Sequence, residues 1–154
     1  MDDCAYMQLA LEQAQLAFDL GEVPIGAVLV VDDEVVAKAH NRRESWHDAT
    51  AHAELMVIQE ACRTLGRWRL SGATLYVTVE PCPMCAGAMV LARIDRVVYG
   101  ATDPKAGAAE SLFNIVSNQT LNHRLQVTAG VMEEECRNIM KAFFRQRRKK
   151  TTNE

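Results

Sequence analysis

Four residues of this sequence have types and a spacing that could do chemistry: His52, Glu54, Cys82 and Cys85. Imidazole nitrogen and thiolate sulfur are common zinc ligands, and three protein ligands leave a fourth position open for water, as in catalytic zinc sites. Zinc lowers the pKa of a bound water to about 7, so hydroxide is available at neutral pH. Glu54 is not needed as a ligand and can take and return the proton. The pattern therefore predicts a zinc site that activates water.

The two cysteines lie three residues apart at the predicted start of a helix, so both thiolates can bind one ion from the same helix face. Pro83 suits the first helical turn, where its missing N–H costs nothing, and a helix N-terminus stabilises thiolates. Taken alone, the segment from Pro81 to Cys85 could also be a redox pair or half of a structural zinc site. His52 turns the prediction toward a catalytic metal.

His52 and Glu54 are two residues apart, which in the middle of a helix would separate them by about 200°. They can converge on one ion only at a helix start, where the first residue does not yet have helical geometry. Asp48 and Thr50, which are good N-cap types, lie just upstream and agree with that position. His40 and His47 lie in or next to polar loop sequence, and we do not expect either to be a fourth ligand.

The elements that must position these residues follow from hydrophobic periodicity and turn residues. A first helix buries Met7, Leu11, Ala14 and Phe18 and ends near Gly21. The remaining predictions are a hairpin of strands 25–31 and 34–39, a polar loop 41–48, a helix 51–64, a strand 74–79, a helix 82–92, a strand 96–100, a loop of small residues 101–109, a short helical piece 112–116, a strand 124–129 and a helix 133–148.

The order of these elements predicts an α/β fold. A strand, a short helix and another strand form a βαβ unit, which makes its two strands parallel with a right-handed crossover. The whole is then a mixed five-stranded sheet with helices on both faces. Because no Pro/Gly/Ser-rich linker interrupts the chain, we expect one domain over residues 1–154, with a basic C-terminal helix from about 133 to 150.

Composition agrees with an ordinary globular protein, since 49% of the residues are hydrophobic and 24% are charged. The N-terminus is acidic, and no run of about 18 uncharged apolar residues occurs, so we expect a cytoplasmic protein that does not bind a membrane. Five cysteines with one close pair do not suggest a disulfide framework. We expect Cys4, Cys62 and Cys136 to be small buried residues of helices.

Charge is unevenly distributed along the chain. Residues 1–136 carry 10 Lys and Arg against 19 Asp and Glu, a net charge of −9, whereas residues 137–154 carry 7 against 1, a net charge of +6. The basic strip 145–150 follows Phe143 and Phe144 directly. It could be a solvated helix end, where cations favour the C-terminal pole of the dipole. It could also bind phosphates next to aromatic rings that stack on unpaired bases.

The spacing of His-x-Glu and Pro-Cys-x-x-Cys resembles the signature of zinc-dependent nucleoside and base deaminases. Longer segments resemble the bacterial tRNA-specific adenosine deaminases, over roughly residues 5–150. They are 22–28, 41–42, 47–54, 75–89, 96–101, 105–109, 122–124 and 143–145, together with Asp103. The resemblance implies a three-layer cytidine-deaminase-like fold and a homodimer with one zinc ion per subunit. The implied reaction converts adenosine to inosine at wobble position 34 of an arginine tRNA through zinc-bound hydroxide.

The resemblance also implies roles for individual residues. His52, Cys82 and Cys85 would bind zinc, and Glu54 would be the proton shuttle. Residues implied to bind the target nucleoside are Asn41, Ile25, Ala53 and Pro81. Residues implied to meet neighbouring anticodon nucleotides are Asp103, Lys105, Asn122 and His123. The last helix, with Phe144, Arg145 and Arg147, is implied to close over the flipped base and hold phosphate. An unpaired anticodon loop suits such an enzyme, because extruding a base from it costs a few kcal/mol at most.

Two other functions fit the same motif. One is deamination of a free base or nucleotide, such as guanine or deoxycytidylate, although a small substrate would need neither the 101–109 loop nor the basic tail. The other is a noncatalytic, zinc-stabilised RNA-binding subunit. A purely structural zinc site would usually close its fourth position and would have no use for Glu54.

Overall fold

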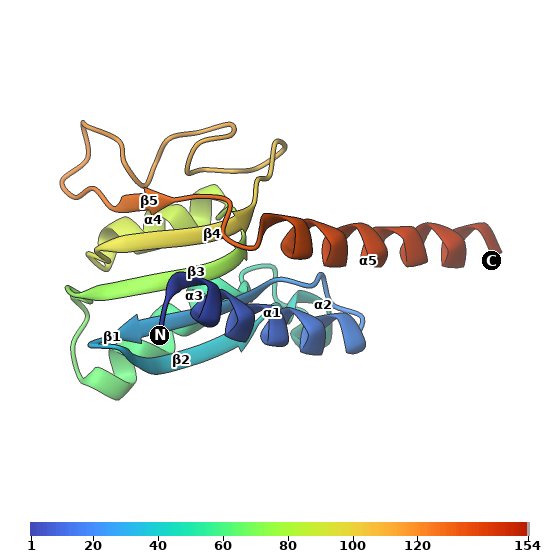
Figure 1. Cartoon of the computed structure of the whole chain (residues 1–154), viewed down its shortest axis with the longest axis horizontal. Helices are drawn as coiled ribbons and strands as arrows, with labels where there is room; N and C mark the ends of the chain where they lie inside the picture. Colours follow the sequence, from blue (N-terminus) through green and yellow to red (C-terminus); the bar gives the residue numbers. More distant parts are fainter. Residues whose placement is uncertain (154) are drawn as a thin grey trace.

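A five-stranded sheet organises the chain in the order β2-β1-β3-β4-β5 (Figure 1). The computed structural model describes residues 1–153; Glu154, which the predicted domain includes, and the side chains from Lys150 onward lie outside the described residues. β1 is antiparallel to β2 and β3, whereas β3, β4 and β5 are mutually parallel, so the mixed sheet is confirmed. The strands are Gly26–Val31 (β1), Glu34–His40 (β2), Ala73–Val79 (β3), Arg96–Ala101 (β4) and Gln126–Thr128 (β5).

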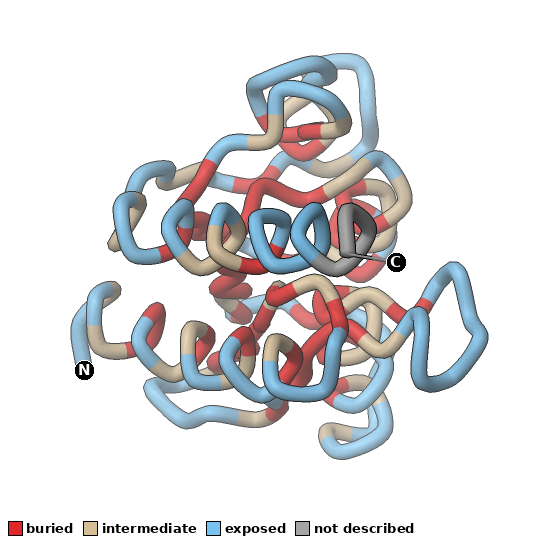
Figure 2. The backbone as a smooth tube through the Cα atoms, turned by 90° about the vertical axis from the view of Figure 1, so that its right-hand side faces the viewer, coloured by how far each residue is buried: buried red, intermediate tan, exposed pale blue. Residues whose placement is uncertain are grey.

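Helices cover both faces of the sheet, as the sequence predicts. α1 and α5 pack on one face, and α3 and α4 pack on the other. Figure 2 shows the buried residues concentrated between these layers. The helices are Asp3–Asp19 (α1), Arg43–Trp46 (α2), Ala53–Leu65 (α3), Pro83–Leu91 (α4) and Glu133–Asn153 (α5). Among the described residues, no helix is long and apolar enough to span a membrane.

The hairpin turn between β1 and β2 has the backbone that its sequence demands. Asp32 and Asp33 both have positive φ, 51° and 61°. A two-residue hairpin turn of this kind matches the twist of the strands it joins, and Asp tolerates the left-handed region better than most residues. The turn fixes the pairing of Val31 with Glu34 at the end of the hairpin.

α1 approaches the sheet more closely than the predicted face implies. Its buried residues are Tyr6, Met7, Ala10, Ala14 and Ala17, whereas the predicted core positions Leu11 and Phe18 are only half-buried. The small alanines let the helix backbone lie directly over Gly26, where a Cβ atom would be 2.6 Å from the backbone nitrogen of Ala14. The close approach of α1 to the sheet therefore explains why its small alanines, and not Leu11 and Phe18, are the buried residues.

Other local predictions were wrong. Segment 112–116 is not helical, because its backbone N–H groups donate to residues 107 and 108 instead of forming a helical ladder. The polar loop 41–48 contains the one-turn helix α2, and β5 spans three residues instead of the predicted six. Of the three cysteines expected in the core, only Cys136 is buried; Cys62 is half-buried and Cys4 is exposed.

Candidate metal centre and RNA groove

Two of the three predicted zinc ligands are the N-cap residues of helices. His52 precedes α3 with φ −88° and ψ 143°, and Cys82 precedes α4 with φ −75° and ψ 172°; neither side chain makes a capping hydrogen bond. Asp48 and Thr50 do not cap α3, because the Asp48 carboxylate accepts from the amide and hydroxyl of Thr50. His52 and Cys82 thus lie at the extended residues before their helices, and for His52 this is the position that its spacing from Glu54 requires.

The three ligand atoms lie where one zinc ion would hold them. The Sγ atoms of Cys82 and Cys85 are each 3.6 Å from Nδ1 of His52, and all three atoms lie within 4.8 Å of one another. Zinc–sulfur bonds of about 2.3 Å and a zinc–nitrogen bond of about 2.0–2.1 Å at a tetrahedral angle require an S···N distance of about 3.6 Å. This group can therefore bind zinc with three protein ligands. Neither His40 nor His47 belongs to it.

Electrostatics at this cluster favour a cation. The hydrogen bond from Cys85 lowers the pKa of the Cys82 thiol to about 4, although burial opposes the shift. The same hydrogen bond, together with burial, raises the pKa of Cys85, and the hydrogen bond to Cys82 raises the pKa of His52. Cys82 is therefore a thiolate at neutral pH, stabilised by hydrogen bonds from Cys85 and His52. A bound metal ion replaces such protons.

Glu54 lies in the first turn of α3 and is 3% exposed. Its Oε1 is the one buried side-chain oxygen or nitrogen without a hydrogen-bond partner among the described residues. Burial raises the pKa of this carboxyl group to about 7. A buried carboxylate is normally satisfied, so the orphaned oxygen points to a partner that the site receives from outside. Its pKa suits a group that takes and returns a proton near neutral pH.

The predicted nucleoside-binding residues surround the same helix start. The buried side-chain oxygen of Asn41 accepts a hydrogen bond from the backbone amide of Ala53 at 2.9 Å, and the backbone N–H of Asn41 donates to the Ile25 carbonyl at 3.1 Å. Pro81 is buried directly before Cys82, and Ile25 is half-buried. The structure therefore brings Asn41, Ile25 and Ala53 together. Their contact with substrate stays a prediction.

Glu22 was missed by the sequence analysis. Its carboxylate, 1% exposed, accepts from the backbone amides of Glu44 at 3.0 Å and Ser45 at 2.6 Å, at the start of α2. These bonds hold the segment between Asn41 and His52. No motif could have revealed the pairing, because the residues are more than 20 positions apart and a buried glutamate looks like any other in sequence.

Glu80 was also missed, although it directly precedes the Pro81-Cys82 segment. Its buried carboxylate accepts from the backbone amides of Asp103 at 3.0 Å, Ala109 at 3.1 Å, Glu110 at 2.8 Å and Ser111 at 2.9 Å, and from the Ser111 hydroxyl. These hydrogen bonds outweigh burial and lower the pKa of Glu80. The residue fixes the 101–111 loop beside the zinc ligands. Its place in front of the motif was the one available signal.

A groove of about 830 Å³ runs between the 101–105 loop and one face of α5. Phe144 and Arg145 line it together with Lys105 and Asp103, as the predicted RNA-binding surface requires. The Asp103 carboxylate, however, already accepts from the amides of Lys105 and Ala106 and so shapes its own loop. Additional cations in the lining are Arg137, Lys141 and Arg148. The groove combines an exposed aromatic ring with a basic wall.

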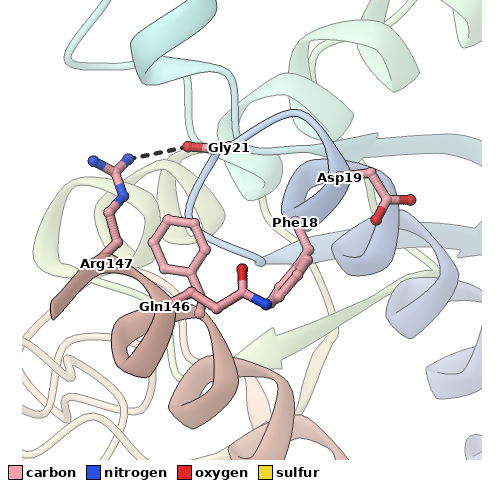
Figure 3. Close-up of a pocket in the computed structure, with 6 residues that line it drawn as sticks. Phe18, Asp19, Gly21, Gln146 and Arg147 are labelled. Carbon is pink, nitrogen blue, oxygen red and sulfur yellow. Dashed lines mark hydrogen bonds between the residues drawn. The ribbon is translucent and has the colours of Figure 1, made fainter. Parts of the chain in front are cut away.

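Arg147 points away from that groove, toward the end of α1 (Figure 3). Its guanidinium donates to the Gly21 carbonyl at 3.0 Å and lies 5.1 Å from the centre of the Phe143 ring. Phe143 packs edge-on against Phe18 of α1, with ring centroids 6.0 Å apart. Arg147 thus links α5 to α1, a different position from that of Phe144 and Arg145.

Asn122 and His123 lie far from the zinc ligands. Nε2 of His123 is 2.6 Å from the carbonyl oxygen of Ile94, just before β4 begins. Cys82 follows the C-terminal end of β3, and β3 and β4 are parallel. The two sites are therefore at opposite ends of the sheet, about 20 Å apart at 3.3 Å per strand residue. An RNA contact by Asn122 or His123 stays a prediction.

Fold and site together define a deaminase with the cytidine-deaminase-like α/β architecture. The family model of MafB19-like deaminases matches residues 1–148. A tRNA-specific adenosine deaminase of Bacillus subtilis (strain 168) is 55% identical over 148 residues, which cover 96% of this chain and 92% of that protein. Another from Agrobacterium fabrum (strain C58 / ATCC 33970) is 51% identical, covering 93% and 94%. The chain belongs to the MafB19-like deaminases and, within them, to the tRNA-specific adenosine deaminases.

Solved structures agree with that assignment. A structure from a study of A-to-I editing by tRNA:A34 deaminases at the wobble position has a TM-score of 0.84 and 51% identity. It is matched over 88% of this chain and 98% of its own. A guanine deaminase from Bacillus subtilis has a TM-score of 0.65 and 37% identity, over 75% of this chain and 73% of its own. The closer agreement in fold and sequence is with the tRNA enzyme.

Proposed function

We propose that this protein is a zinc-dependent tRNA adenosine deaminase that converts adenosine to inosine at wobble position 34 of an arginine tRNA. The observation that carries the proposal is the orphaned carboxylate oxygen of Glu54 next to the His52, Cys82 and Cys85 group. The similarity of the chain to tRNA-specific adenosine deaminases supports the substrate. In the overall reaction water adds to C6 of adenine and ammonia departs, so adenosine and water become inosine and ammonia.

In this proposal His52, Cys82 and Cys85 hold the zinc ion. Zinc, when bound, supplies a Lewis acid that activates water at neutral pH. Glu54 takes a proton from the attacking water and delivers it to the departing amine, for which its raised pKa and unpaired Oε1 are suited. A noncatalytic RNA-binding subunit would gain nothing from a buried carboxylate with one unpaired oxygen.

The substrate is held by two parts of the chain. Asn41, Ile25, Ala53 and Pro81 are proposed to enclose the target base, since three of them meet at the start of α3 and Pro81 precedes a ligand. The groove between Lys105 and Arg145 is proposed to take the flanking nucleotides, with Phe144 as a stacking ring and its cations near phosphates. In this proposal the basic residues of the tail bind RNA phosphates, in addition to stabilising the C-terminal end of the helix.

We also propose a homodimer of one-domain subunits with one zinc ion each, working in the cytoplasm where tRNA is modified. The relatives' tRNA specificity supports the location. Exposed apolar side chains, including Leu91 at 71% exposure and Leu112 at 53%, are available to a second copy. Sedimentation of the zinc-loaded protein measures the subunit number directly.

The experiment is a deamination assay with the full-length, zinc-loaded protein. The substrate is an arginine tRNA anticodon stem-loop with adenosine at position 34, and the product is scored as A to G after reverse transcription. The matched control carries that adenosine at a neighbouring anticodon position. Free adenosine, guanine and deoxycytidylate are compared, because the guanine deaminase fold is also similar. We expect inosine only at position 34; turnover of guanine without turnover of the stem-loop would replace this function by the free-base one.

A further inference from the structure

Trp46 is an exposed aromatic residue that the proposed function does not yet use. It ends the one-turn helix α2, and 53% of its surface is exposed. The Arg42 guanidinium lies over its ring, 5.3 Å from the ring centre. Indole rings and guanidinium planes are the surfaces on which unpaired bases stack, and a cation over a tryptophan ring is favourable in its own right. This pair is separate from the groove along α5.

A second groove of about 380 Å³ adjoins the pair, between α1, β2 and α3. Its wall includes the cations Lys38, Arg42 and Arg63 against one carboxylate, that of Glu60. Residues 1–136 have a net charge of −9, so a local excess of positive charge on this part of the chain is notable. Phosphates are the partners that such a wall attracts. The groove therefore has the charge that a nucleic-acid strand requires.

The segment that carries Trp46 is tied to the zinc site at both of its ends. The Arg42 amide donates to the Ala51 carbonyl at 3.0 Å, and the Asn41 side chain accepts from the Ala53 amide at 2.9 Å. His52 lies between Ala51 and Ala53, the two residues that make these hydrogen bonds. The Glu22 carboxylate accepts hydrogen bonds from the Glu44 and Ser45 amides and so fixes the start of α2. Trp46 is thus held at a fixed position beside the residues that contain the metal ligand.

We propose that Trp46 and Arg42 form a stacking platform for an unpaired nucleotide of the RNA substrate that flanks the target adenosine. The inference rests on the proposed function, and it adds a second RNA-binding surface whose lining residues differ from those of the α5 groove. The adjoining cations Lys38 and Arg63 contact the phosphates of the same strand. Each of the two surfaces holds one neighbour of the target base.

Trp68 provides a matched comparison within the same chain. It is 59% exposed and also carries an arginine over its ring, since Arg69 lies 5.0 Å from the ring centre. Trp68 follows the C-terminal end of α3, whereas His52 precedes its N-terminal end. A helix of 13 residues separates the two by about 20 Å. Both tryptophans have an arginine over the ring, and only Trp46 lies on the segment that is hydrogen-bonded to the residues on either side of His52.

Fluorescence tests the platform directly, because the chain has two tryptophans. Trp68→Phe leaves Trp46 as the sole indole, and Trp46→Phe leaves Trp68. Both are combined with Glu54→Gln to prevent turnover, loaded with zinc and titrated with the arginine anticodon stem-loop. We expect the emission of Trp46 to be quenched as the RNA binds and that of Trp68 to remain unchanged. Equal responses of the two tryptophans, or none from Trp46, would overturn the proposal.

Binding and turnover give an independent readout. Trp46→Ala should weaken stem-loop binding by about 5- to 150-fold, the range for loss of one stacked base, with a rise in KM and little change in kcat. Trp46→Phe should restore most of the affinity, and Trp68→Ala should bind within twofold of the wild type. If the wild type forms inosine but Trp46→Ala binds as Trp68→Ala does, the platform is wrong and the function stands. If the wild type forms no inosine from the stem-loop, both are wrong.

Discussion

The carboxylate of Glu80 and the backbone amide of Asp103 are joined by a hydrogen bond of 3.0 Å. Glu80 leads from β3 into the zinc ligands, and Asp103 opens the loop that lines the α5 groove. A further bond from the Ala108 amide to the Pro81 carbonyl, 2.8 Å long, runs beside it. The metal site and the proposed RNA groove are therefore built on one hydrogen-bonded unit.

Glu80→Gln should loosen that unit without removing zinc. Each of the groups that bind the carboxylate donates a hydrogen bond to it, so an amide NH2 in place of either oxygen faces an N–H or O–H group. We expect a loss of about 1–3 kcal/mol in the free energy of unfolding, measured by urea denaturation. KM for the stem-loop should rise while bound zinc, measured by elemental analysis, stays at wild-type content. Glu12→Gln, at an exposed position of α1, is the control and should change neither the free energy of unfolding nor KM.

Glu54→Gln should abolish turnover and keep the metal. The substitution preserves the shape of the side chain but removes the group that takes and returns the proton. We expect kcat to fall by at least about 10²-fold, with zinc content and stem-loop affinity unchanged. Single-turnover deamination and elemental analysis on the same sample separate the two effects. Glu54→Ala should behave in the same way, and substantial activity in either variant would remove Glu54 from the mechanism.

Sequence rules located the two helix starts of the metal site because each start depends on residues that are close in sequence. The spacing of His52 and Glu54, and the Pro83 between the cysteines, dictate two helix starts, and both were found. The supports of that centre were invisible because they are long-range. The carboxylates of Glu22 and Glu80 accept hydrogen bonds from amides more than 20 residues away. A pattern within one segment cannot report a partner in another.

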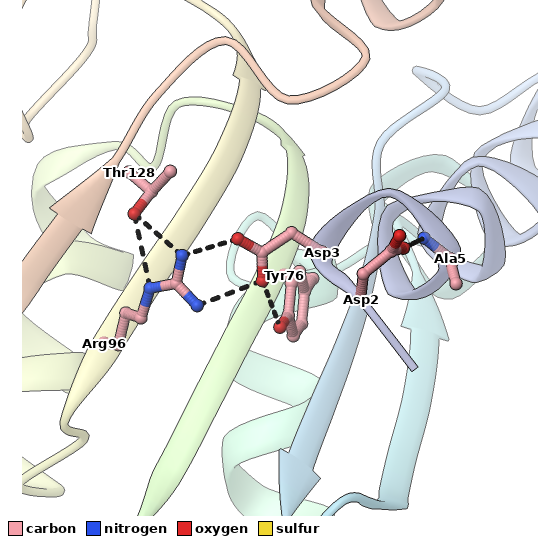
Figure 4. A network of polar contacts seen from close by, with 6 residues as sticks. All are labelled: Asp2, Asp3, Ala5, Tyr76, Arg96 and Thr128. Atoms are coloured by element: carbon pink, nitrogen blue, oxygen red, sulfur yellow. Dashed lines mark hydrogen bonds and ion pairs between the residues drawn. The ribbon is translucent and has the colours of Figure 1, made fainter.

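Asp3→Asn should lower stability in a pH-dependent way. Asp3 binds Arg96 at 2.6 and 3.0 Å and accepts from the Tyr76 hydroxyl, so it joins α1 to β3 and β4 (Figure 4). The hydrogen bond from Arg96 holds the pKa of Asp3 below its usual 3.8. Its stabilisation is therefore present above about pH 4 and is lost as pH falls through the folded-state pKa.

The pair is partly exposed, so we expect a difference of about 1 kcal/mol between the wild type and Asp3→Asn at pH 7. Urea denaturation between pH 7 and pH 3 should show that difference shrinking toward the acid end. Asp2→Asn is the matched control, because Asp2 is the N-cap of α1 and asparagine caps a helix as well as aspartate does. A constant difference across the pH range would rule out the ionised pair as its cause.

Gly26→Ala and Gly87→Ala should have opposite effects on stability. A Cβ atom at Gly26 would lie 2.6 Å from the Ala14 nitrogen and 2.8 Å from Cβ of Gln13, against the backbone of α1. We expect a loss of about 1–3 kcal/mol or more, because the helix would have to move off the sheet. At Gly87, inside α4, a Cβ atom meets nothing within 4 Å, so alanine should add about 0.5–1 kcal/mol through helix propensity. Thermal unfolding of both variants checks the sign.

Substitution of Arg145 should weaken RNA binding, whereas substitution of Arg147 should lower the stability of the fold. Arg145 lines the groove with Phe144, so Arg145→Gln should weaken stem-loop binding and flatten its salt dependence by about one phosphate contact. Arg147 already binds the Gly21 carbonyl and the Phe143 ring. Arg147→Gln should therefore lower the free energy of unfolding by up to about 1 kcal/mol and leave the dependence of RNA affinity on salt concentration unchanged. Binding titrations between 50 and 200 mM salt, paired with urea denaturation, measure both. A reduced slope for Arg147→Gln would return that residue to the RNA-binding surface predicted from the sequence, and would mean that its bond to Gly21 gives way when RNA binds.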